Sequence, residues 1–327
     1  MRAAVVLVVL APLLAAVFVA GLRGAGVFDE EAAPAAAATP TATASPTAAP
    51  ATTTTIEVGR GPDGITVADD GVVWVADATA GTIAQVSGDA VTGEPIDAGA
   101  QPDSPVVADG VLWVVASADD AVRRIEDGEV QTIPVGKAPE SLAAGGAFVY
   151  VTNGGDGTVT RIDRASGEVV GGPIGVGGRP LDIAVDGETA WVTSFDDGTV
   201  TPLDITSSTP GEPIEVGGSP RGVAVGEGSV WVANAGEGTV TRIDAEDRAV
   251  AGEPIQVGAN PREIAFGEGA VWVANAGDDT VTRIDAATGE VVGEPIETGD
   301  DPIGIAVGDG AVWTANFRDG TVTKIEP

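Results

Sequence analysis

Short apolar stretches alternate with glycine-containing polar turns from about residue 52 to the end of the chain. Between residues 221 and 258 the stretches read "RGVAVGE", "SVWVANA", "GTVTRID" and "AVAGEPIQVG". Stretches of this length that are rich in β-branched residues and bounded by glycine are typical of β-strands. We therefore predict four strands. The first is small and apolar, as a crowded inner strand must be, and the fourth carries a proline that a sheet tolerates best at its edge.

This unit occurs seven times, and each copy has one aromatic residue in its second stretch and a proline just before or at the start of its first. The aromatic residues lie 37 to 41 residues apart and are Trp74, Trp113, Tyr150, Trp191, Trp231, Trp272 and Trp313. The prolines are Pro62, Pro102, Pro139, Pro180, Pro220, Pro261 and Pro302. Four-stranded units at this period, apolar on both faces, predict an all-β fold, a seven-bladed β-propeller of four-stranded blades.

The seventh copy ends with "GTVTKIEP", its third strand, and lacks a fourth. The missing strand is found at the start of the repeats, because "TTTTIEVGRGP" (52–62) matches "PGEPIEVGGSP" (210–220). We therefore expect Thr53–Gly59 to complete the seventh blade of a propeller that spans residues 52–327. Closing the ring in this way removes an open sheet edge.

Residues 1–24 have the pattern of a membrane-targeting segment. Arg2 precedes an uncharged run from Ala3 to Leu22, whose length as a helix matches the thickness of a bilayer. We expect a single N-terminal hydrophobic helix that acts as an uncleaved signal anchor, with a cleaved signal peptide as the alternative. The predicted location is extracytoplasmic, anchored in the cell membrane or alternatively secreted. Residues 25–51, rich in Ala, Thr and Pro, predict a disordered linker.

Composition removes several classes of function. The chain has no cysteine and no histidine, which excludes disulfides, a cysteine nucleophile, a Ser-His-Asp triad and the usual zinc ligand sets. Its net charge is −33 and its isoelectric point about 4.1. Nucleic acid is not expected as a partner, because binding it requires a basic surface.

Candidate binding residues lie on two kinds of turn that a propeller brings to one face around its central channel. The turn before the first strand supplies Arg60, Lys137, Arg179, Arg221 and Arg262. The turn after the second strand supplies Asn153, Asn234, Asn275 and Asn316, with Asp77 in the first copy. Converging guanidinium groups suit a carboxylate, phosphate or sulfate group. Two alternatives stay open: the arginines pair with acids such as Asp182 or Glu263, and the asparagines only end their strands.

Two further repeated features are interpreted as structural. The "GDGT"-type turns at 155–158, 196–199, 277–280 and 318–321 are typical of hairpins, and calcium binding is the alternative. The arginines of "TRID", which are Arg161, Arg242 and Arg283, are expected to pack their stems between blades and pair with acids. No catalytic residue, metal ligand or cofactor is assigned, and calcium or magnesium is the alternative.

The segment "VYVTN" at 149–153, with "VWVAN", "VWVAD" and "AWVTS" in register elsewhere, resembles the YVTN family of β-propeller repeat proteins over residues 52–327. Such repeats occur in secreted and surface proteins and in extracellular sensor domains, so the resemblance implies a scaffold for binding. The repeats also resemble the virginiamycin B lyase family, another seven-bladed propeller, whose chemistry relies on histidine, glutamate and magnesium. Because this chain has no histidine, that catalytic residue is not carried over.

We therefore expect a membrane-tethered, non-enzymatic propeller that acts as a binding, interaction or sensor scaffold. The expected partner is a protein, an envelope glycan or a small anionic ligand, with membrane contact through the N-terminal segment only and a monomeric state. The first alternative is a metal-dependent lyase or hydrolase that uses carboxylates of the channel. The second is a structural surface protein.

Overall fold

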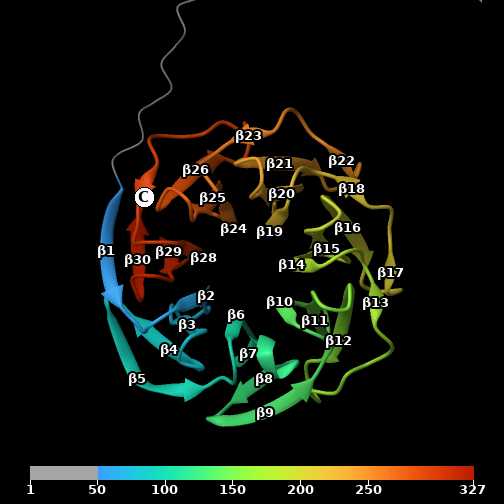
Figure 1. Ribbon diagram of the computed structural model, residues 1–327, viewed down its shortest axis with the longest axis vertical. Helices are drawn as coiled ribbons and strands as arrows, with labels where there is room; N and C mark the ends of the chain where they lie inside the picture. Colours follow the sequence, from blue (N-terminus) through green and yellow to red (C-terminus); the bar gives the residue numbers. More distant parts are fainter. Residues whose placement is uncertain (1–50) are drawn as a thin grey trace, which may run out of the picture. The chain divides into compact units, whose positions relative to one another are not determined.

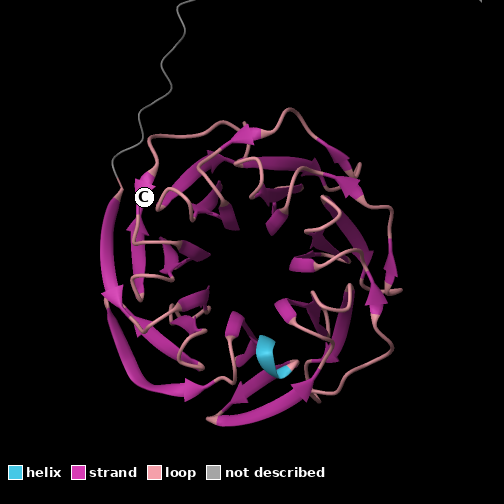
Figure 2. Ribbon diagram, viewed as in Figure 1, coloured by secondary structure: helices cyan, strands magenta, loops and turns pink. Residues whose placement is uncertain are grey.

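The computed structural model describes residues 51–327. The predicted signal anchor (1–24), its hydrophobic helix and all of the predicted linker except Ala51 lie outside the described residues. The described chain forms seven antiparallel sheets arranged as a ring around a central axis (Figures 1 and 2). The predicted seven-bladed propeller of four-stranded blades is confirmed.

Blades are numbered in chain order. Blade 1 contains β2 (Pro62–Val67), β3 (Val73–Asp77), β4 (Thr82–Ser87) and β5 (Ala90–Asp97). Blade 2 contains β6 (Pro102–Ala108), β7 (Val111–Ala116), β8 (Ala121–Glu126) and β9 (Glu129–Pro134). Blade 3 contains β10 (Pro139–Gly145), β11 (Phe148–Asn153), β12 (Thr158–Asp163) and β13 (Ile174–Gly175). Blade 4 contains β14 (Pro180–Asp186), β15 (Thr189–Ser194), β16 (Thr199–Asp204), β17 (Thr209–Pro210) and β18 (Ile214–Glu215).

Blades 5 to 7 complete the ring. Blade 5 contains β19 (Pro220–Gly226), β20 (Ser229–Asn234), β21 (Thr239–Asp244), β22 (Ala249–Val250) and β23 (Ile255–Gln256). Blade 6 contains β24 (Pro261–Gly267), β25 (Ala270–Asn275), β26 (Thr280–Asp285) and β27 (Ile296–Glu297). Blade 7 contains β28 (Pro302–Gly308), β29 (Ala311–Asn316), β30 (Thr321–Glu326) and, from the start of the described chain, β1 (Thr52–Glu57).

The hydrophobic core lies between neighbouring blades and is divided into seven clusters. The second strand of a blade supplies both sides, because its alternate residues point to opposite faces of the sheet. In β25, Val271 and Val273 pack against blade 5, whereas Trp272 and Ala274 pack against blade 7. Every residue of β25 is buried for this reason. The repeated apolar pattern is thus a direct consequence of being enclosed by two neighbours.

Ring closure is confirmed. Strand β1 pairs antiparallel with β30, from Thr52 opposite Glu326 to Glu57 opposite Thr321. The ladder extends slightly further, because the backbone N–H groups of Val58 and Gly59 both donate to the carbonyl oxygen of Gly320 at 3.0 and 3.2 Å. The core cluster between blades 7 and 1 includes Ile56 of this strand.

The outer strands differ from the prediction. The stretch "AVAGEPIQVG" is not one strand: it forms two pieces, β22 and β23, both paired with β21. Blade 4 divides in the same way, whereas β5 and β9 run through. The interruption falls at the "GEP" segment, where Pro254 has no N–H to donate and Gly252 adopts a positive φ of 83°. Strand β5 contains the same segment, with Gly93 at a φ of 71°, and keeps its pairing with β4 across a shift of register between Ile83 and Gln85. The outer edge of the ring is therefore irregular, and the inner strands are regular.

The single helix among the described residues is a short 3₁₀ turn, Ser117–Asp119, between β7 and β8 (cyan in Figure 2). Across residues 51–327, no helix has both the length and the apolar character needed to cross a membrane.

Candidate functional site in the central cavity

Each inner strand contains a β-bulge just after its repeated proline. In β19, Pro220 lies opposite Asn234 of β20, but the next paired residues are Val223 and Val232. The same shift of register occurs in all seven blades. A bulge turns a side chain away from the regular alternation of a strand. Residues that follow the repeated proline therefore line the centre of the ring.

The residue before the proline reinforces this turn of the chain. In six blades it has a left-handed backbone, with φ between 46° and 61°, at Gln101, Ala138, Arg179, Ser219, Asn260 and Asp301. This conformation is uncommon for residues other than glycine. It places Arg179 and Asp301 on the wall of the central cavity.

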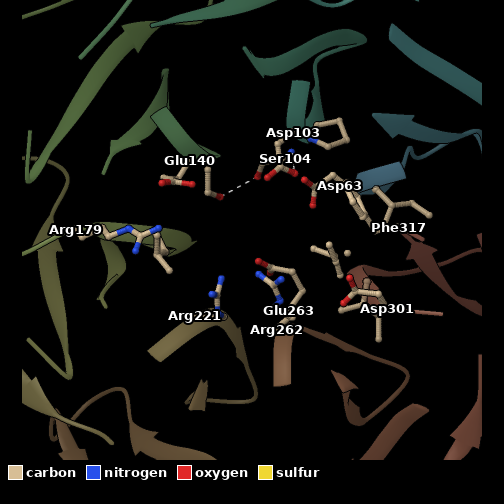
Figure 3. Close-up of a pocket in the computed structure, with 18 residues that line it drawn as sticks. Asp63, Asp103, Ser104, Glu140, Arg179, Arg221, Arg262, Glu263, Asp301 and Phe317 are labelled. Carbon is tan, nitrogen blue, oxygen red and sulfur yellow. Dashed lines mark hydrogen bonds between the residues drawn. The ribbon is translucent and has the colours of Figure 1, made fainter. Parts of the chain in front are cut away.

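The central cavity has a volume of about 440 Å³. Six of its charged side chains form two groups by blade (Figure 3), and Glu263 of blade 6 and Asp301 of blade 7 line it as well. Blades 1 to 3 contribute the acidic arc, which we define as Asp63, Asp103 and Glu140. Blades 4 to 6 contribute the arginine arc, which we define as Arg179, Arg221 and Arg262. The cavity thus has a negative side and a positive side, although the protein as a whole is strongly acidic.

The arginine arc has free capacity to bind an anion. Within residues 51–327 its three members form no ion pair with any carboxylate, so pairing with Asp182 or Glu263 is not observed. The buried Nε atoms of Arg221 and Arg262 have no hydrogen-bond partner. Burial and then the nearby charge of Arg262 lower the pKa of Arg221 to about 10.

An aromatic ring positions two of these guanidinium groups. Phe195, just after β15, has the guanidinium carbon of Arg179 at 5.1 Å and that of Arg221 at 5.2 Å from its ring centre. Stacking of this kind is favourable and leaves the N–H donors at the guanidinium edges free. Phe195 therefore fixes two cationic side chains without neutralising their charge.

The acidic arc is destabilised in its charged form. Burial raises the pKa of Asp63 to about 6, and repulsion from Asp301 and Glu140 adds to the effect against the attraction of Arg262. Burial, followed by repulsion from Asp63, raises the pKa of Asp103 well above its usual range. Burial also raises the pKa of Glu140, with Arg179 and Arg221 acting in the opposite direction. A cation in this part of the cavity would relieve the repulsion.

Two further acids belong to the cavity wall. Burial, and then the neighbouring carboxyl groups of Asp182 and Asp103, raise the pKa of Glu263 well above its usual range. The charge of Arg221 acts on the pKa of Glu263 in the opposite direction. Asp301 is paired with Arg318, whose Nε lies 3.3 Å from the Asp301 Oδ2.

A chain of hydrogen bonds begins on the cavity wall, at Ser104 and Ser141, and links blades 2 to 5. The hydroxyl groups of Ser104 and Ser141 lie 2.9 Å apart, and Ser141 donates to Oδ1 of Asp182 at 2.7 Å. The other oxygen of Asp182 accepts the backbone N–H of Val223 at 2.7 Å. This buried carboxyl group acts as a structural link between adjacent inner strands.

The magnesium that the family resemblance implies does not fit these acids. Among residues 51–327, no three carboxyl groups gather closely enough to hold a metal ion. The turn aspartates considered for calcium have another role, since Asp156 accepts the N–H of Lys137 and Asp278 that of Ala259, both at 2.6 Å. In blades 3 and 6 these bonds join the two turns that meet at one end of the blade.

The other sequence-predicted residues lie outside the central cavity. Arg60 and Lys137 are exposed, and the Lys137 Nζ is 2.5 Å from Asp120. The predicted asparagines are fully buried and none lines the cavity: Asn153, Asn234, Asn275 and Asn316. Each donates through Nδ2 to threonine hydroxyl groups of the third strand in its blade. The structure therefore brings together Arg179, Arg221 and Arg262 and separates them from the other candidates.

The acidic arc was not predicted. Its members share one position in the repeat, directly after the proline, where blades 4 to 7 carry Leu181, Arg221, Arg262 and Ile303. Aligning this position across the copies would have shown three acids followed by basic and apolar residues.

The arginines of "TRID" stack on aromatic rings of their own blade instead of pairing with acids. Their guanidinium carbons lie 4.6 to 5.1 Å from ring centres, with Arg161 over Phe148, Arg242 over Trp231 and Arg283 over Trp272. Within the described chain, these three arginines form no ion pair. These arginines are structural, as predicted, but each contacts the face of an aromatic ring and not an acid.

A closed ring of seven four-stranded blades with charged residues in its central cavity defines the protein as a seven-bladed β-propeller. Residues 50–325 match the virginiamycin B lyase family, and the chain belongs to that family.

Solved structures show the same fold. Virginiamycin B lyase from Staphylococcus aureus is 18% identical, with a TM-score of 0.75 and with 85% of this chain and 100% of that chain covered. A catalytically inactive form of that enzyme, determined with quinupristin, is also 18% identical, with a TM-score of 0.74 and the same coverage. Hydrazine synthase of Kuenenia stuttgartiensis is 20% identical, with a TM-score of 0.71 and with 82% and 96% covered. No curated protein matches the chain.

Proposed function

We propose that the protein is a non-enzymatic binding module that takes a small anionic ligand in its central cavity. The observation that carries the proposal is the arginine arc: Arg179, Arg221 and Arg262 come from consecutive blades, face one cavity and form no ion pair among the described residues. Planar guanidinium groups bind carboxylate, phosphate and sulfate groups through paired N–H donors. A protein or an envelope glycan that presents such a group would bind through the same three arginines.

Repulsion within the arc supports this function. Burial of Arg221 and then the charge of Arg262 lower the pKa of Arg221, and an anion bound between them would offset both effects. The acidic exterior adds specificity, because a highly charged anion such as nucleic acid is repelled before it reaches the cavity. The ligand is therefore expected to be small.

We further propose that the propeller works as a monomer outside the cytoplasm, tethered by residues 1–24 and the linker that follows. The support is the sequence alone, in the uncharged run behind Arg2 and the Ala/Thr/Pro-rich segment. A rigid ring on a long linker suits a sensor or interaction scaffold, which is the function that the YVTN resemblance implies.

Thermal unfolding tests the anion site. Phosphate, sulfate and citrate should raise the melting temperature in a concentration-dependent way, because a ligand that binds only the native state stabilises it. The triple variant Arg179→Ala, Arg221→Ala and Arg262→Ala should lose this rise. The matched control is Arg60→Ala with Lys137→Ala, which removes exposed cations outside the cavity and should keep it. An equal rise in the triple variant would show that the arginine arc is not the site.

A second candidate function is that of a lyase. Family membership favours it, and so does Asp63, because a carboxyl group with a pKa of about 6 suits proton transfer near neutral pH. In this function Asp63 would accept a proton while the arginine arc stabilises negative charge that develops on a leaving oxygen.

Quinupristin, with which the inactive Staphylococcus aureus enzyme was determined, is the probe for this activity. A lyase breaks a bond without adding water, whereas a hydrolase adds the mass of one water molecule. Mass spectrometry after incubation distinguishes the two, and Asp63→Asn should abolish either product. An unchanged substrate would leave the binding function as the better explanation of the cavity.

A further inference from the structure

We propose that the ligand of the central cavity is dipolar, with a carboxylate group on the arginine arc and an ammonium group on the acidic arc, in the size range from an amino acid to a short peptide. This inference rests on the proposed binding function and names the class of ligand. It is carried by the arrangement of both arcs around one cavity (Figure 3).

The first argument is the order of charges around the ring. Three consecutive blades place an acid in the cavity and the next three place an arginine there. Blade 7 places Ile303 and Asp301 between Arg262 and Asp63, and Asp301 is paired with Arg318. Charges of opposite sign would cancel if they alternated, whereas sorted charges form a field across the cavity. A ligand with one charge of each sign matches this field at both ends.

The second argument is that neither arc is neutralised by the protein. Among the described residues, Asp63, Asp103 and Glu140 form no ion pair, just as the arginine arc forms none. Among the described residues, the one hydrogen bond to a carboxyl group of the acidic arc is local, from the backbone N–H of Ser104 to the adjacent Asp103 at 2.6 Å. Half-buried charged groups normally find partners, because isolated charges are costly away from water.

The third argument is that the other acids in or beside the cavity have partners in the protein. Asp301 pairs with Arg318, and Asp182, beside the cavity, is hydrogen-bonded to Ser141 and to the backbone of Val223. Glu263 lies next to the arginine arc, where the charge of Arg221 opposes the rise that burial causes in its pKa. The acidic arc forms no ion pair among the described residues, so its carboxyl groups are the ones available to an ammonium group.

The fourth argument is room for a substituent at the ammonium end. A second, more open cavity of about 1020 Å³ lies over blades 1 and 2 and shares Asp63, Asp103 and Glu140 with the first. Its wall consists largely of small residues, including Ala78, Thr79, Gly99 and Ala100. An amino-acid side chain or a further peptide residue can extend there while the two charged groups stay in the central cavity. The central cavity alone, at about 440 Å³, is of a size that suits a small ligand, since small-molecule pockets span about 300–1,000 Å³.

Isothermal titration calorimetry on the whole chain tests the inference with matched probes. Glycine, 4-aminobutyrate, 6-aminohexanoate and triglycine carry both charges at increasing separation, whereas hexanoate carries only the anion and hexylamine only the cation. The best dipolar probe should bind at least about tenfold more tightly than hexanoate or hexylamine.

Variants assign the two ends. Asp63→Asn with Asp103→Asn should remove the advantage of the dipolar probe, whereas hexanoate should bind at least as tightly as before, because two negative charges near the arginine arc are lost. Arg221→Gln with Arg262→Gln should weaken both probes. The control pair Asp69→Asn with Asp186→Asn changes the same charge at exposed positions outside the cavities and should change nothing. Melting curves confirm that each variant is folded.

The outcomes separate this inference from the proposed function. If hexanoate binds through the arginine arc and no dipolar probe binds more tightly, the inference is wrong and the anion site stands. If hexylamine binds as tightly as the dipolar probes, the arginine arc has no part and both proposals fail. Magnesium binding that is lost in Asp63→Asn with Asp103→Asn would assign the acidic arc to a metal and overturn the inference. The absence of any binding, together with an anion response unchanged by the arginine variants, would reject both.

Discussion

The second strand of each blade and the bulge after each proline belong to the same small sheets, yet they vary in opposite ways. Strands β20, β25 and β29 read "SVWVAN", "AVWVAN" and "AVWTAN", and all of their residues are buried. The bulge position instead carries two aspartates, a glutamate, a leucine, two arginines and an isoleucine in the seven blades. The second strand contacts two neighbouring blades, so the residue types that fit there are restricted by packing on both faces. The bulge faces only the cavity. Repetition therefore marks the scaffold and departure from repetition marks the site.

Deletion of the closing strand β1 should have the largest effect on the stability of the scaffold. A chain that lacks residues 1–60 loses β1, its six-residue ladder with β30 and the buried side chain of Ile56. We expect its melting temperature to fall by more than about 10 °C relative to a chain that lacks residues 1–50, since several kcal/mol are lost. Calorimetric melting of the two truncations measures this. Equal melting temperatures would mean that β1 does not hold the ring closed.

Two substitutions within blade 6 test the comparison directly. Trp272→Ala removes a fully buried ring from β25 and should lower the free energy of unfolding by about 3–5 kcal/mol. Arg262→Ala, at the bulge of β24, should change it by less than about 1 kcal/mol and should abolish the anion-induced rise in melting temperature. Urea unfolding of both variants gives the two values. Similar losses in both would show that the bulge residues also belong to the scaffold.

The scaffold could be predicted because its physical cause is repeated seven times. Inter-blade packing imposes the same apolar residues in every copy, so the number of blades and the closing strand followed from the spacing of tryptophan and proline. The arginine arc was also found, because basic residues are rare in this chain and three recur near the same proline. The break between β22 and β23 was missed, because both the continuous β5 and the interrupted strand contain "GEP".

The acidic arc could not be predicted in the same way. Asp63 lies in "GPDG", which is typical of a turn, and Glu140 lies in "APES", so the acids share a position in the repeat but no common sequence around it. Their meaning depends on blade order, which places three acids side by side and opposite three arginines. Their raised pKa values depend on the burial that the bulge produces, which no local pattern reveals.

The raised pKa of Asp63 makes the stability of the protein depend on pH, and this dependence tests the role of the cavity residues. Its pKa in the folded protein is about 6, against an ordinary value of 3.8, so between these values the folded state binds more protons than the unfolded state. Stability should therefore fall as the pH rises from about 4 to about 6 and then level off. Asp63→Asn removes this loss and should be more stable than the natural protein by up to about 3 kcal/mol at pH 7, with no difference below about pH 4.

Unfolding at a series of pH values measures the difference, and the exposed Asp69→Asn is the control, with a flat difference expected. If Asp63→Asn is more stable than the natural protein but no longer binds the dipolar ligand, the Asp63 carboxylate serves binding and lowers the stability of the fold. A loss of stability at pH 7 would instead mean that the Asp63 carboxylate already has a partner in the free protein.

The smallest effect concerns a residue on the border between scaffold and site. Asn275 ends β25 and was predicted to bind ligand, but its amide donates to Thr280 and Thr282 at 3.2 and 2.9 Å and accepts the N–H of Gly258 at 3.1 Å. Removing a buried amide leaves these partners unsatisfied, so Asn275→Ala should cost about 1–3 kcal/mol and leave anion binding unchanged. The chain itself supplies the milder case, because the equivalent position in blade 4 is Ser194. Asn275→Ser should accordingly lose less stability than Asn275→Ala. Loss of binding with stability intact in either variant would move Asn275 from the scaffold to the site.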